Sequence, residues 1–371
     1  MSLPELPTVV DNKITVKAIT YQNYSTPPKL TTIQYDVPSS TTLIGPDEVL
    51  VKNKAVSINP VDIILASFAL KVFKGSSDKV MGGDFSGIVA QVGSNITDFK
   101  IGDRVVGNCL KIFGVKAAFQ DFVIVDAKKD NLLSKVPEGM SFVEAAALPI
   151  ASGTAFQLIT EHRNLKGSNV LIFGAGSSVG SYGIQFAKHY YGAKNVVVTC
   201  SPRSSQRSLD YGADKVVDYT KGNSNELKEI LQIVKEIGKF DLVLDTVRDT
   251  SILNNLSDVL KTRKEGGIYA QVGGLATCNY ENPSMFQTIP TLKTLSEMFK
   301  SMIGLSKFDV HTASLNSSTN KAWEKAVAQL WSEGKFKIPL ASKVFKFETE
   351  YTEAIQTVAK SSGGGKVVME L

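Results

Sequence analysis

A glycine-rich segment near the middle of the chain has the composition of a nucleotide-binding turn. Residues 169–180 read NVLIFGAGSSVG, an apolar run followed by small residues. This order predicts a strand, a tight turn and a helix, and the unpaired N–H groups at the start of such a helix attract phosphate. The glycine spacing, Gly-x-Gly-x-x-x-Gly, differs from the ideal dinucleotide fingerprint. The predicted phosphate-binding residues are Gly174, Gly176, Ser177, Ser178, Val179 and Gly180.

The same segment is compatible with a second chemistry. Residues 176–180 match the Gly-x-Ser-x-Gly pattern of a nucleophile elbow, with Ser178 as the nucleophile. A serine hydrolase also needs an acid and a histidine downstream, and the downstream histidines are His189 and His311. No His-Gly segment that could form an oxyanion hole precedes Ser178. The serine hydrolase therefore stays a remote alternative.

The residues after the next predicted strand discriminate between the two nicotinamide cofactors. An NAD site usually places an acid about 20 residues after the glycine turn, where it binds the ribose 2′-hydroxyl. Here that stretch reads VTCSPR and contains no acid. Ser201, Arg203 and Arg207 instead supply hydroxyl and guanidinium donors that suit a 2′-phosphate. The sequence therefore predicts NADP(H) rather than NAD(H).

Alternating strands and helices would bring these residues to one edge of a sheet. Apolar runs and amphipathic segments alternate between residues 169 and 272, which predicts a doubly wound parallel sheet. Residues 13–140 are rich in short β-type runs separated by turn residues. The predicted fold class is α/β, with a Rossmann-type sheet and a β-rich second domain. The predicted strands are 169–173, 195–200, 215–217, 240–245 and 267–272, and the predicted helices are 179–191, 206–211, 225–237, 252–260 and 320–333.

Length and composition exclude several classes of protein. The chain has 371 residues, enough for about two domains, and its 41 basic and 36 acidic side chains leave a formal charge of +5. That excess is too dilute for a nucleic-acid surface. The 3 cysteines lie far apart and form no disulfide framework or zinc lobe, which favours a reducing compartment. Without a signal-like start or a long apolar run, we expect a cytoplasmic protein.

Further motifs occur in an order that resembles one family. They are Asn-Pro-x-Asp at 59–62, Gly-x-Asp-x-x-Gly at 82–87, GDRV at 102–105, AAALP at 145–149, GAD at 212–214 and GKVV at 365–368. Together they resemble the medium-chain dehydrogenase/reductase family, in its zinc-independent, quinone-oxidoreductase-like branch, over nearly the whole chain. Within that branch the chain looks most similar to fungal members associated with lipid droplets.

The resemblance implies two domains and a reaction. A GroES-like substrate domain would comprise residues 1–147 and be completed by 315–371, and a Rossmann-type NADP(H)-binding domain would comprise 148–314, with the active site between them. Hydride would pass from NADPH to a quinone or an α,β-unsaturated carbonyl compound. Zinc-dependent relatives have Cys where this chain has Asn59, and a His-Glu pair at Gly83 and Asp84. Since the residues present cannot form a tetrahedral zinc site, we expect no metal.

The resemblance also implies roles for single residues. The Asn59 amide would face the nicotinamide ribose or the acceptor carbonyl, and Asp62 would orient it, which makes these two the candidate catalytic residues. Tyr219 would lie near the adenosine phosphate. The remaining expected cofactor-binding residues are Asp245, Val272 and Gly273. Asp245 could equally cap the helix that follows its strand.

Two departures leave alternatives open. Many relatives carry an arginine and a glycine after the Asn-Pro-x-Asp motif, whereas this chain continues IILASF. A non-catalytic NADPH-binding sensor or tether of the same fold is therefore the second hypothesis. In addition, residues 285–305 are apolar on one face, which is compatible with a substrate lid, a homodimer surface or contact with a lipid surface. The last of these would place the protein peripherally on lipid droplets.

Overall fold

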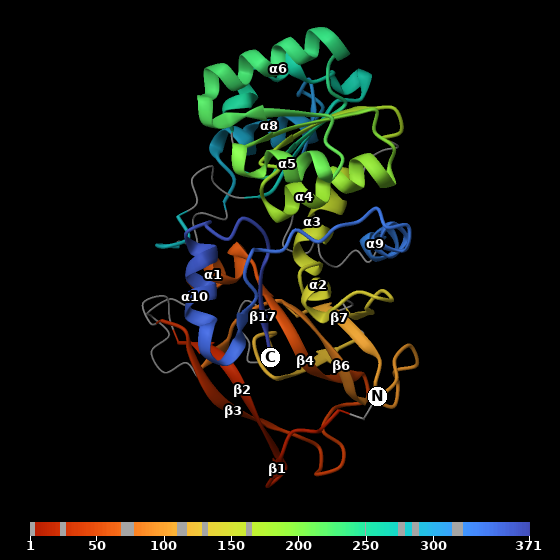
Figure 1. Ribbon diagram of the computed structural model, residues 1–371, viewed down its shortest axis with the longest axis vertical. Coiled ribbons are helices and arrows are strands. Elements are labelled where there is room, and N and C mark those ends of the chain that lie inside the picture. Colours follow the sequence, from red (N-terminus) through yellow and green to blue (C-terminus); the bar gives the residue numbers. More distant parts are fainter. Residues whose placement is uncertain are drawn as a thin grey trace. The chain divides into compact units, whose positions relative to one another are not determined.

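A computed structural model describes most of the chain as two units (Figure 1). The described residues are 4–22, 27–67, 78–109, 117–127, 133–160, 165–248, 250–273, 279–283, 289–313 and 322–371. Unit 1 consists of Met1–Ile150, Asn279–Met285 and Leu340–Leu371, and unit 2 consists of Ala151–Cys278 and Phe286–Pro339. The first boundary, predicted at residue 147, thus lies at Ile150.

The chain returns to unit 1 later than the sequence predicts. The return expected at residue 315 is at Leu340, so helix α9 (Ala322–Ser332) belongs to unit 2. The segment after α9 is held there by packing, because the Phe336 ring stacks on the Tyr182 ring with their centroids 5.4 Å apart. A contact between side chains so distant in sequence leaves no local signal, and this explains the misplaced boundary.

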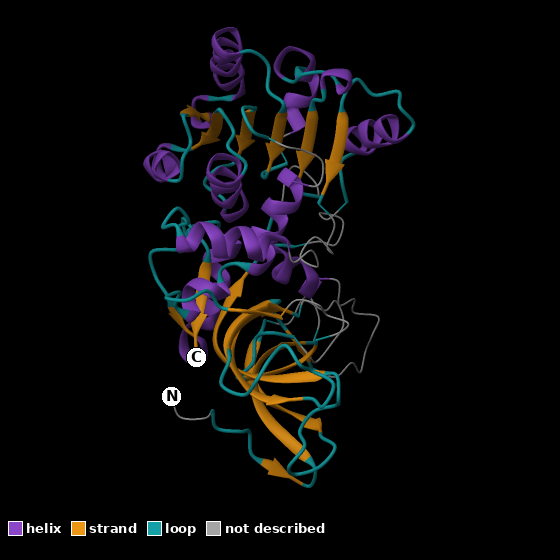
Figure 2. Ribbon diagram, turned by 90° about the vertical axis from the view of Figure 1, so that its right-hand side faces the viewer, coloured by secondary structure: helices purple, strands orange, loops and turns teal. Residues whose placement is uncertain are grey.

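Unit 2 is built on a parallel sheet of six strands in the order β12-β11-β10-β13-β14-β15. Figure 2 shows these strands with helices on both sides. The chain order reverses between β10 and β13, the point at which ligands bind beyond the carboxyl ends of such sheets. This topology confirms the predicted Rossmann-type fold. The strands are β10 (Asn169–Phe173), β11 (Asn195–Cys200), β12 (Lys215–Asp218), β13 (Leu242–Asp245), β14 (Ile268–Gln271) and β15 (Asp309–Thr312).

The central strands of unit 2 are largely apolar because both of their faces are covered. Leu171 of β10 and Val243 of β13 are fully buried and share a core with Ile230 of α6. The α-helices of unit 2, with α3 beginning at the unit boundary, are α3 (Pro149–Thr160), α4 (Ser178–Gln185), α5 (Pro202–Asp210), α6 (Asn223–Ile237), α7 (Leu256–Val259), α8 (Leu292–Met302) and α9. A π-helical turn, η1 (Phe186–Tyr190), continues α4.

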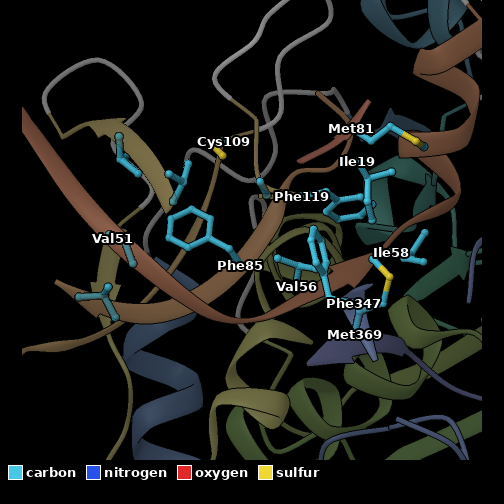
Figure 3. Close-up of a cluster of buried hydrophobic side chains, with 14 of the residues drawn as sticks. Ile19, Val51, Val56, Ile58, Met81, Phe85, Cys109, Phe119, Phe347 and Met369 are labelled. Carbon is cyan, nitrogen blue, oxygen red and sulfur yellow. The ribbon is translucent and has the colours of Figure 1, made fainter. Parts of the chain in front are cut away.

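Unit 1 is the predicted β-rich, GroES-like unit. One sheet has the order β16-β17-β4-β6-β7-β9, with β8 also paired to β4, and the other has the order β1-β2-β3, with β5 paired to β2. Its core gathers around the buried rings of Phe85, Phe119 and Phe347 (Figure 3). The elements are β1 (Val9–Val10), β2 (Lys13–Tyr21), β3 (Lys29–Asp36), β4 (Glu48–Ile58), α1 (Pro60–Ser67), β5 (Lys79–Val80), β6 (Asp84–Val92), β7 (Arg104–Asn108), β8 (Phe122–Asp126), β9 (Leu133–Lys135), α2 (Phe142–Ala146), β16 (Phe345–Lys346), α10 (Phe347–Ala359) and β17 (Val367–Glu370).

Candidate functional site

The glycine turn follows β10, and each of its glycines lies where a side chain would collide. Gly174 has a φ of +75°, and a Cβ atom there would lie 2.2 Å from Val247 Cγ1. A Cβ on Gly180 would lie 2.5 Å from the carbonyl oxygen of Gly174, so α4 packs directly on the turn. A Cβ on Gly176 would lie 2.8 Å from Ser204 Oγ. The turn is therefore tight and presents bare backbone to a ligand.

The Ser177 side chain caps the first turn of helix α4 and satisfies one of its backbone N–H groups. Ser177 Oγ accepts a hydrogen bond from the Gly180 N–H at 3.0 Å and lies 2.9 Å from Thr246 Oγ1. The N–H groups of Ser178 and Val179 belong to the first helical turn, where an α-helix offers no intrahelical acceptor. Together with the helix dipole they can bind an anion such as a phosphate.

The arginines predicted to bind a 2′-phosphate lie on α5, which follows β11. Ser201 is the N-cap residue of α5, and β11 ends at Cys200 rather than at an acid. Arg203 is exposed in the first turn of α5. Arg207, one turn later, donates a hydrogen bond from Nη2 to the carbonyl oxygen of Gly176 at 3.2 Å. The structure thus brings a guanidinium group against the glycine turn.

A cavity of about 150 Å³ in unit 2 reaches Phe173, the last residue of β10. It is lined by apolar and polar side chains, namely Phe173, Asn223, Ser224, Glu226, Leu227, Ile230, Ile252 and Asn255. Tyr219, which is 48% exposed, lies between β12 and α6 in the short helix η2 (Tyr219–Lys221). This is the edge at which open α/β sheets bind their ligands.

Asp245 ends β13 with both carboxylate oxygens used inside the protein. They accept hydrogen bonds from the N–H groups of Val247 (3.0 Å) and Arg248 (2.6 Å), the Tyr269 hydroxyl (2.8 Å) and Gln271 Nε2 (3.2 Å). Arg248 has a φ of +63°, a conformation that residues other than glycine rarely adopt. Asp245 therefore shapes the loop after β13, and its direct contact with a cofactor stays a prediction.

Val272 and Gly273 lie directly after β14 and beside the loop after β13. The Val272 N–H donates to the carbonyl oxygen of Asp245 at 2.9 Å. A Cβ on Gly273 would lie 3.2 Å from the carbonyl oxygen of Ala313, a close contact that a larger residue would relieve only by shifting the backbone. The predicted cofactor-binding residues thus follow the carboxyl ends of β10, β11, β12, β13 and β14, at one edge of the sheet.

Buried polar side chains surround Asn59 in unit 1. Asn59 Nδ2 donates to Asp84 Oδ2 at 2.8 Å, and Asn59 Oδ1 accepts from Lys366 Nζ. Lys366 Nζ also lies 3.3 Å from Asp84 Oδ2. Asp84 Oδ1 accepts from Asn108 Nδ2 at 2.8 Å and from the Ile150 N–H at 3.1 Å. We call Asn59, Asp62, Asp84, Asn108 and Lys366 the Asn59 cluster.

The charges of the Asn59 cluster are held away from water. Asp84 is 0% exposed, Asp62 is 3% exposed and Lys366 is 4% exposed. Asp62 Oδ2 accepts from the Asn59 N–H at 2.7 Å, whereas burial and then the negative charge of Asp84 raise the pKa of Asp62 to about 7. Burial lowers the pKa of Lys366, and the two carboxylates oppose that shift. A protonated Asp62 would bring this group of three ionisable side chains close to neutrality.

Asp84 and Lys366 are the residues that sequence reasoning did not assign to the site. Both lie in motifs that it recorded, at 82–87 and 365–368, yet neither was given a role. The available signal was a charged residue at the start of an apolar strand, since Lys366 precedes VVM and Asp84 precedes F. Such a residue, if its strand is buried, needs a partner for its charge.

Comparisons with known proteins are consistent with this architecture. Residues 45–138 match the family "Alcohol dehydrogenase GroES-like domain", and residues 211–369 match "Zinc-binding dehydrogenase". The protein YIM1-1 of Lachancea thermotolerans is 30% identical over 332 residues, which cover 87% of this chain and 90% of that protein. The chain belongs to the medium-chain dehydrogenase/reductase family. Membership of this family places it among oxidoreductases.

Solved structures of medium-chain dehydrogenases/reductases share the fold. The quinone oxidoreductase from Coxiella burnetii has a TM-score of 0.73 and 23% identity, and the match covers 96% of this chain and 99% of that one. The CurK enoyl reductase has a TM-score of 0.69 and 21% identity, and the match covers 97% of this chain and 99% of that one. These likenesses confirm the two-domain fold of the family.

The zinc suggested by one family description does not fit the residues of this medium-chain protein. In the described part of the chain, no three His, Cys, Asp or Glu side chains group as metal ligands would. Within the Asn59 cluster, the oxygens Asn59 Oδ1 and Asp84 Oδ2 both contact the Lys366 ammonium. A divalent cation bound there would lie against a fixed positive charge.

The hydrolase triad is not assembled among the described residues. The ring of His189 is hydrogen-bonded to the Tyr211 carbonyl oxygen, 3.1 Å away, at the far end of the helix that starts at Ser178. His311 lies on β15, with β13 and β14 between it and β10. His162 lies outside the described residues. The geometry therefore counts against Ser178 as a nucleophile.

The apolar segment at 285–305 is described from residue 289 onward, and Met285 and Phe286 lie outside the described residues. Its helix α8 exposes several large apolar side chains: Leu292 (86%), Phe299 (58%), Met302 (76%) and, just beyond the helix, Leu305 (74%). None of the described helices has both the length and the hydropathy needed to cross a membrane.

Proposed function

We propose that the protein is an NADPH-dependent, zinc-independent reductase that transfers a hydride to a quinone or an α,β-unsaturated carbonyl compound. The observation that carries this proposal is the pair of arginines on α5, one of which contacts the glycine turn, after a strand that ends without an acid. A guanidinium group there favours a 2′-phosphate, whereas NAD(H) sites use a carboxylate.

The predicted cofactor-binding residues other than Asp245 each have a role in this proposal. The N–H groups of Ser178 and Val179 bind the pyrophosphate, while Arg203 and Arg207 bind the 2′-phosphate together with the Ser201 hydroxyl. Tyr219 and the lined cavity hold the adenosine end, and the Val272–Gly273 backbone lies along the nicotinamide. The bound NADPH supplies the hydride. The remaining glycine-turn residues, Gly174, Gly176, Ser177 and Gly180, shape the turn.

The acceptor class follows from the charges of unit 1. In zinc-dependent relatives the metal polarises a ketone or aldehyde for hydride transfer, whereas here the Lys366 ammonium contacts Asn59 and Asp84, which stand at two of the ligand positions of those relatives. Acceptors that are already activated, such as quinones and enones, need only a position and a hydrogen bond to the carbonyl oxygen. Asn59 is the candidate donor of that bond, and Asp62 holds the Asn59 backbone.

The test is a fluorescence titration of the purified protein with NADPH and with NADH at matched ionic strength, followed by a panel of quinones and enones. We expect tighter binding of NADPH and its oxidation by at least one acceptor class. Binding of NADPH without turnover would favour the sensor or tether instead. Binding of neither cofactor would refute the proposal, and labelling of Ser178 by a fluorophosphonate would then test the hydrolase.

We further propose that α8 is a contact surface, because side chains as exposed as Leu292 and Met302 seldom gather on one helix without a partner. A lipid surface is the proposed partner, with a second copy of the chain as the alternative. The test is flotation with triolein droplets coated in phosphatidylcholine. The double variant Leu292→Ser, Met302→Ser should lose flotation, whereas Ile101→Ser, at another exposed apolar residue, should not. The molar mass of the protein in solution, measured by light scattering, tests the alternative: a dimer that becomes a monomer in the double variant would favour contact with a second copy of the chain.

A further inference from the structure

Lys366 is brought to Asn59 by the pairing of two distant strands. β17 and β4 are antiparallel, and Val367 is paired with Ile58. Lys366, one residue before Val367, therefore lies opposite Asn59, one residue after Ile58. The two residues are 307 positions apart in the chain, and their side chains are joined by a hydrogen bond from Nζ to Oδ1. The sheet register thus places an ammonium group on the amide.

The ammonium of Lys366 is almost completely buried and yet has partners for its charge. Lys366 is 4% exposed, its Nζ lies 3.3 Å from Asp84 Oδ2, and Asp84 is 0% exposed. Removing either charge would leave the other unpaired in a medium of low polarity, which is strongly unfavourable. The pair is therefore a fixed feature of unit 1 rather than a surface ion pair that forms and breaks.

This buried pair determines which way the Asn59 amide is turned. The amide oxygen meets the Lys366 ammonium, which only donates, and the amide nitrogen meets the Asp84 carboxylate, which accepts when ionised. A rotation by 180° would place NH₂ against NH₃⁺ and the oxygen against COO⁻. Both contacts would then be repulsive, so a single orientation is stable.

The orientation turns the amide nitrogen toward hydrogen-bond acceptors. Among the described residues, Asn59 Nδ2 donates to Asp84 Oδ2 at 2.8 Å, and a hydrogen bond from the Asn59 side chain to the Asp62 carboxyl group partly opposes the rise in the pKa of Asp62. The N–H that Asp84 does not hold is the donor that complements a carbonyl oxygen of an acceptor. The amide oxygen, by contrast, already accepts a hydrogen bond from the Lys366 ammonium.

We propose that Lys366 is a positioning residue that, with Asp84, locks the Asn59 amide with its nitrogen toward the acceptor's carbonyl oxygen, so that an internal ammonium replaces a metal ion as the buried cation of the site. The inference rests on the proposed reductase function and deepens it. It predicts that the positive charge at residue 366, rather than the volume of the side chain, supports turnover.

The test uses the full-length protein and chemical rescue. Lys366→Ala should lower kcat for quinone or enone reduction at least tenfold, with the Kd for NADPH changed less than twofold, because the predicted cofactor residues lie in unit 2. Added n-propylamine, which restores the missing carbons and the ammonium, should recover activity in a saturable manner, whereas 1-propanol should not. Lys343→Ala, at a surface ion pair of the same unit, serves as the control and should behave as wild type.

A second readout does not depend on activity. In protein labelled with [¹⁵N]asparagine, the Asn59 side-chain signals are identified by their loss in Asn59→Ala. Their N–H exchange with solvent should be slow in wild type, at least tenfold faster in Lys366→Ala, and slow again with propylamine. If Lys366→Ala does not fold, Lys366→Met retains the apolar volume and should show the same loss of kcat and the same fast exchange.

The outcomes separate the two proposals. Unchanged kcat and exchange in Lys366→Ala or Lys366→Met would overturn the positioning role, and so would equal rescue by propanol and propylamine. If wild type turns over no acceptor, the proposed function fails, while the exchange measurement still decides whether Lys366 locks the amide.

Discussion

The contact between Arg207 and the glycine turn makes the two α5 arginines distinguishable by experiment. Arg203 is exposed and has no role in the turn, so its removal should affect the 2′-phosphate alone. Arg207 donates to the Gly176 carbonyl oxygen at 3.2 Å and also supports the backbone that would bind the pyrophosphate common to NADPH and NADH. We therefore expect Arg203→Ala to be selective for NADPH and Arg207→Ala to weaken both cofactors, NADPH more strongly.

The magnitudes follow from the strength of charged hydrogen bonds. A hydrogen bond to a charged group contributes about 1.5–3 kcal/mol, and about 1.4 kcal/mol corresponds to tenfold in Kd. Because Arg203 is exposed and screened by salt, we place it at the lower end, about a tenfold rise in the Kd for NADPH. For Arg207→Ala we expect the Kd to rise roughly 30-fold for NADPH and about threefold for NADH.

The assay is the cofactor fluorescence titration at two salt concentrations, with NADH as the ligand that lacks the phosphate. Arg263→Ala is the matched control, because Arg263 forms an ion pair with Asp309 elsewhere in unit 2. This variant should bind NADPH and NADH with the affinities of the wild type. Higher salt should weaken NADPH more than NADH in wild type, and this difference should shrink in Arg203→Ala. Equal losses of NADPH and NADH in both arginine variants would refute the assignment of a 2′-phosphate site.

Two further predictions concern the glycine turn and the Asn59 cluster. Gly180→Ala places a Cβ 2.5 Å from a backbone oxygen, so α4 must shift. The affinities for NADPH and NADH should both fall at least tenfold, and the unfolding temperature should fall by roughly 3–10 °C. In the control Gly45→Ala the new Cβ meets only the flexible Glu48 side chain, so neither quantity should change, whereas unaltered cofactor binding in Gly180→Ala would contradict the close packing. Because the folded-state pKa of Asp62 is raised to about 7, the ionisation of Asp62 lowers the free energy of unfolding as the pH rises from about 4 to 7. Urea unfolding should therefore show that Asp62→Asn gains about 2 kcal/mol relative to wild type between pH 5.5 and pH 8, and the same offset at both pH values would argue against a buried, protonated carboxyl.

The central strands of unit 2 were predictable because their burial on both faces requires consecutive apolar residues. β10 and β11 have the predicted limits, since a strand covered on both faces reads as an apolar run. Helix limits were less accurate. The helix predicted at 206–211 begins at Pro202, because proline is favoured at the first helical position, where no N–H is needed. The helix predicted at 179–191 changes to a π-helical turn at Phe186.

The site was only partly predictable, for a reason that the Asn59 cluster illustrates. The motifs marked Asn59 and Asp62, but the partners of Asn59 come from β6 and from the residue before β17. Their distances depend on the register of two antiparallel strand pairs, which the composition of each strand does not determine. Asp245 was recognised as an important residue, whereas its four internal donors became visible only in the folded chain.

The sequence by itself determined the order of strands and helices, the glycine turn and the basic residues after β11, because each is a local pattern of burial, backbone freedom or charge. Only the tertiary structure decided that an ammonium lies against Asn59, that Arg207 contacts the glycine turn, and that α9 belongs to unit 2. Each of these contacts joins segments far apart in the chain. Long-range contacts of this kind depend on how strands pair and helices pack, and no local pattern in the sequence encodes that choice.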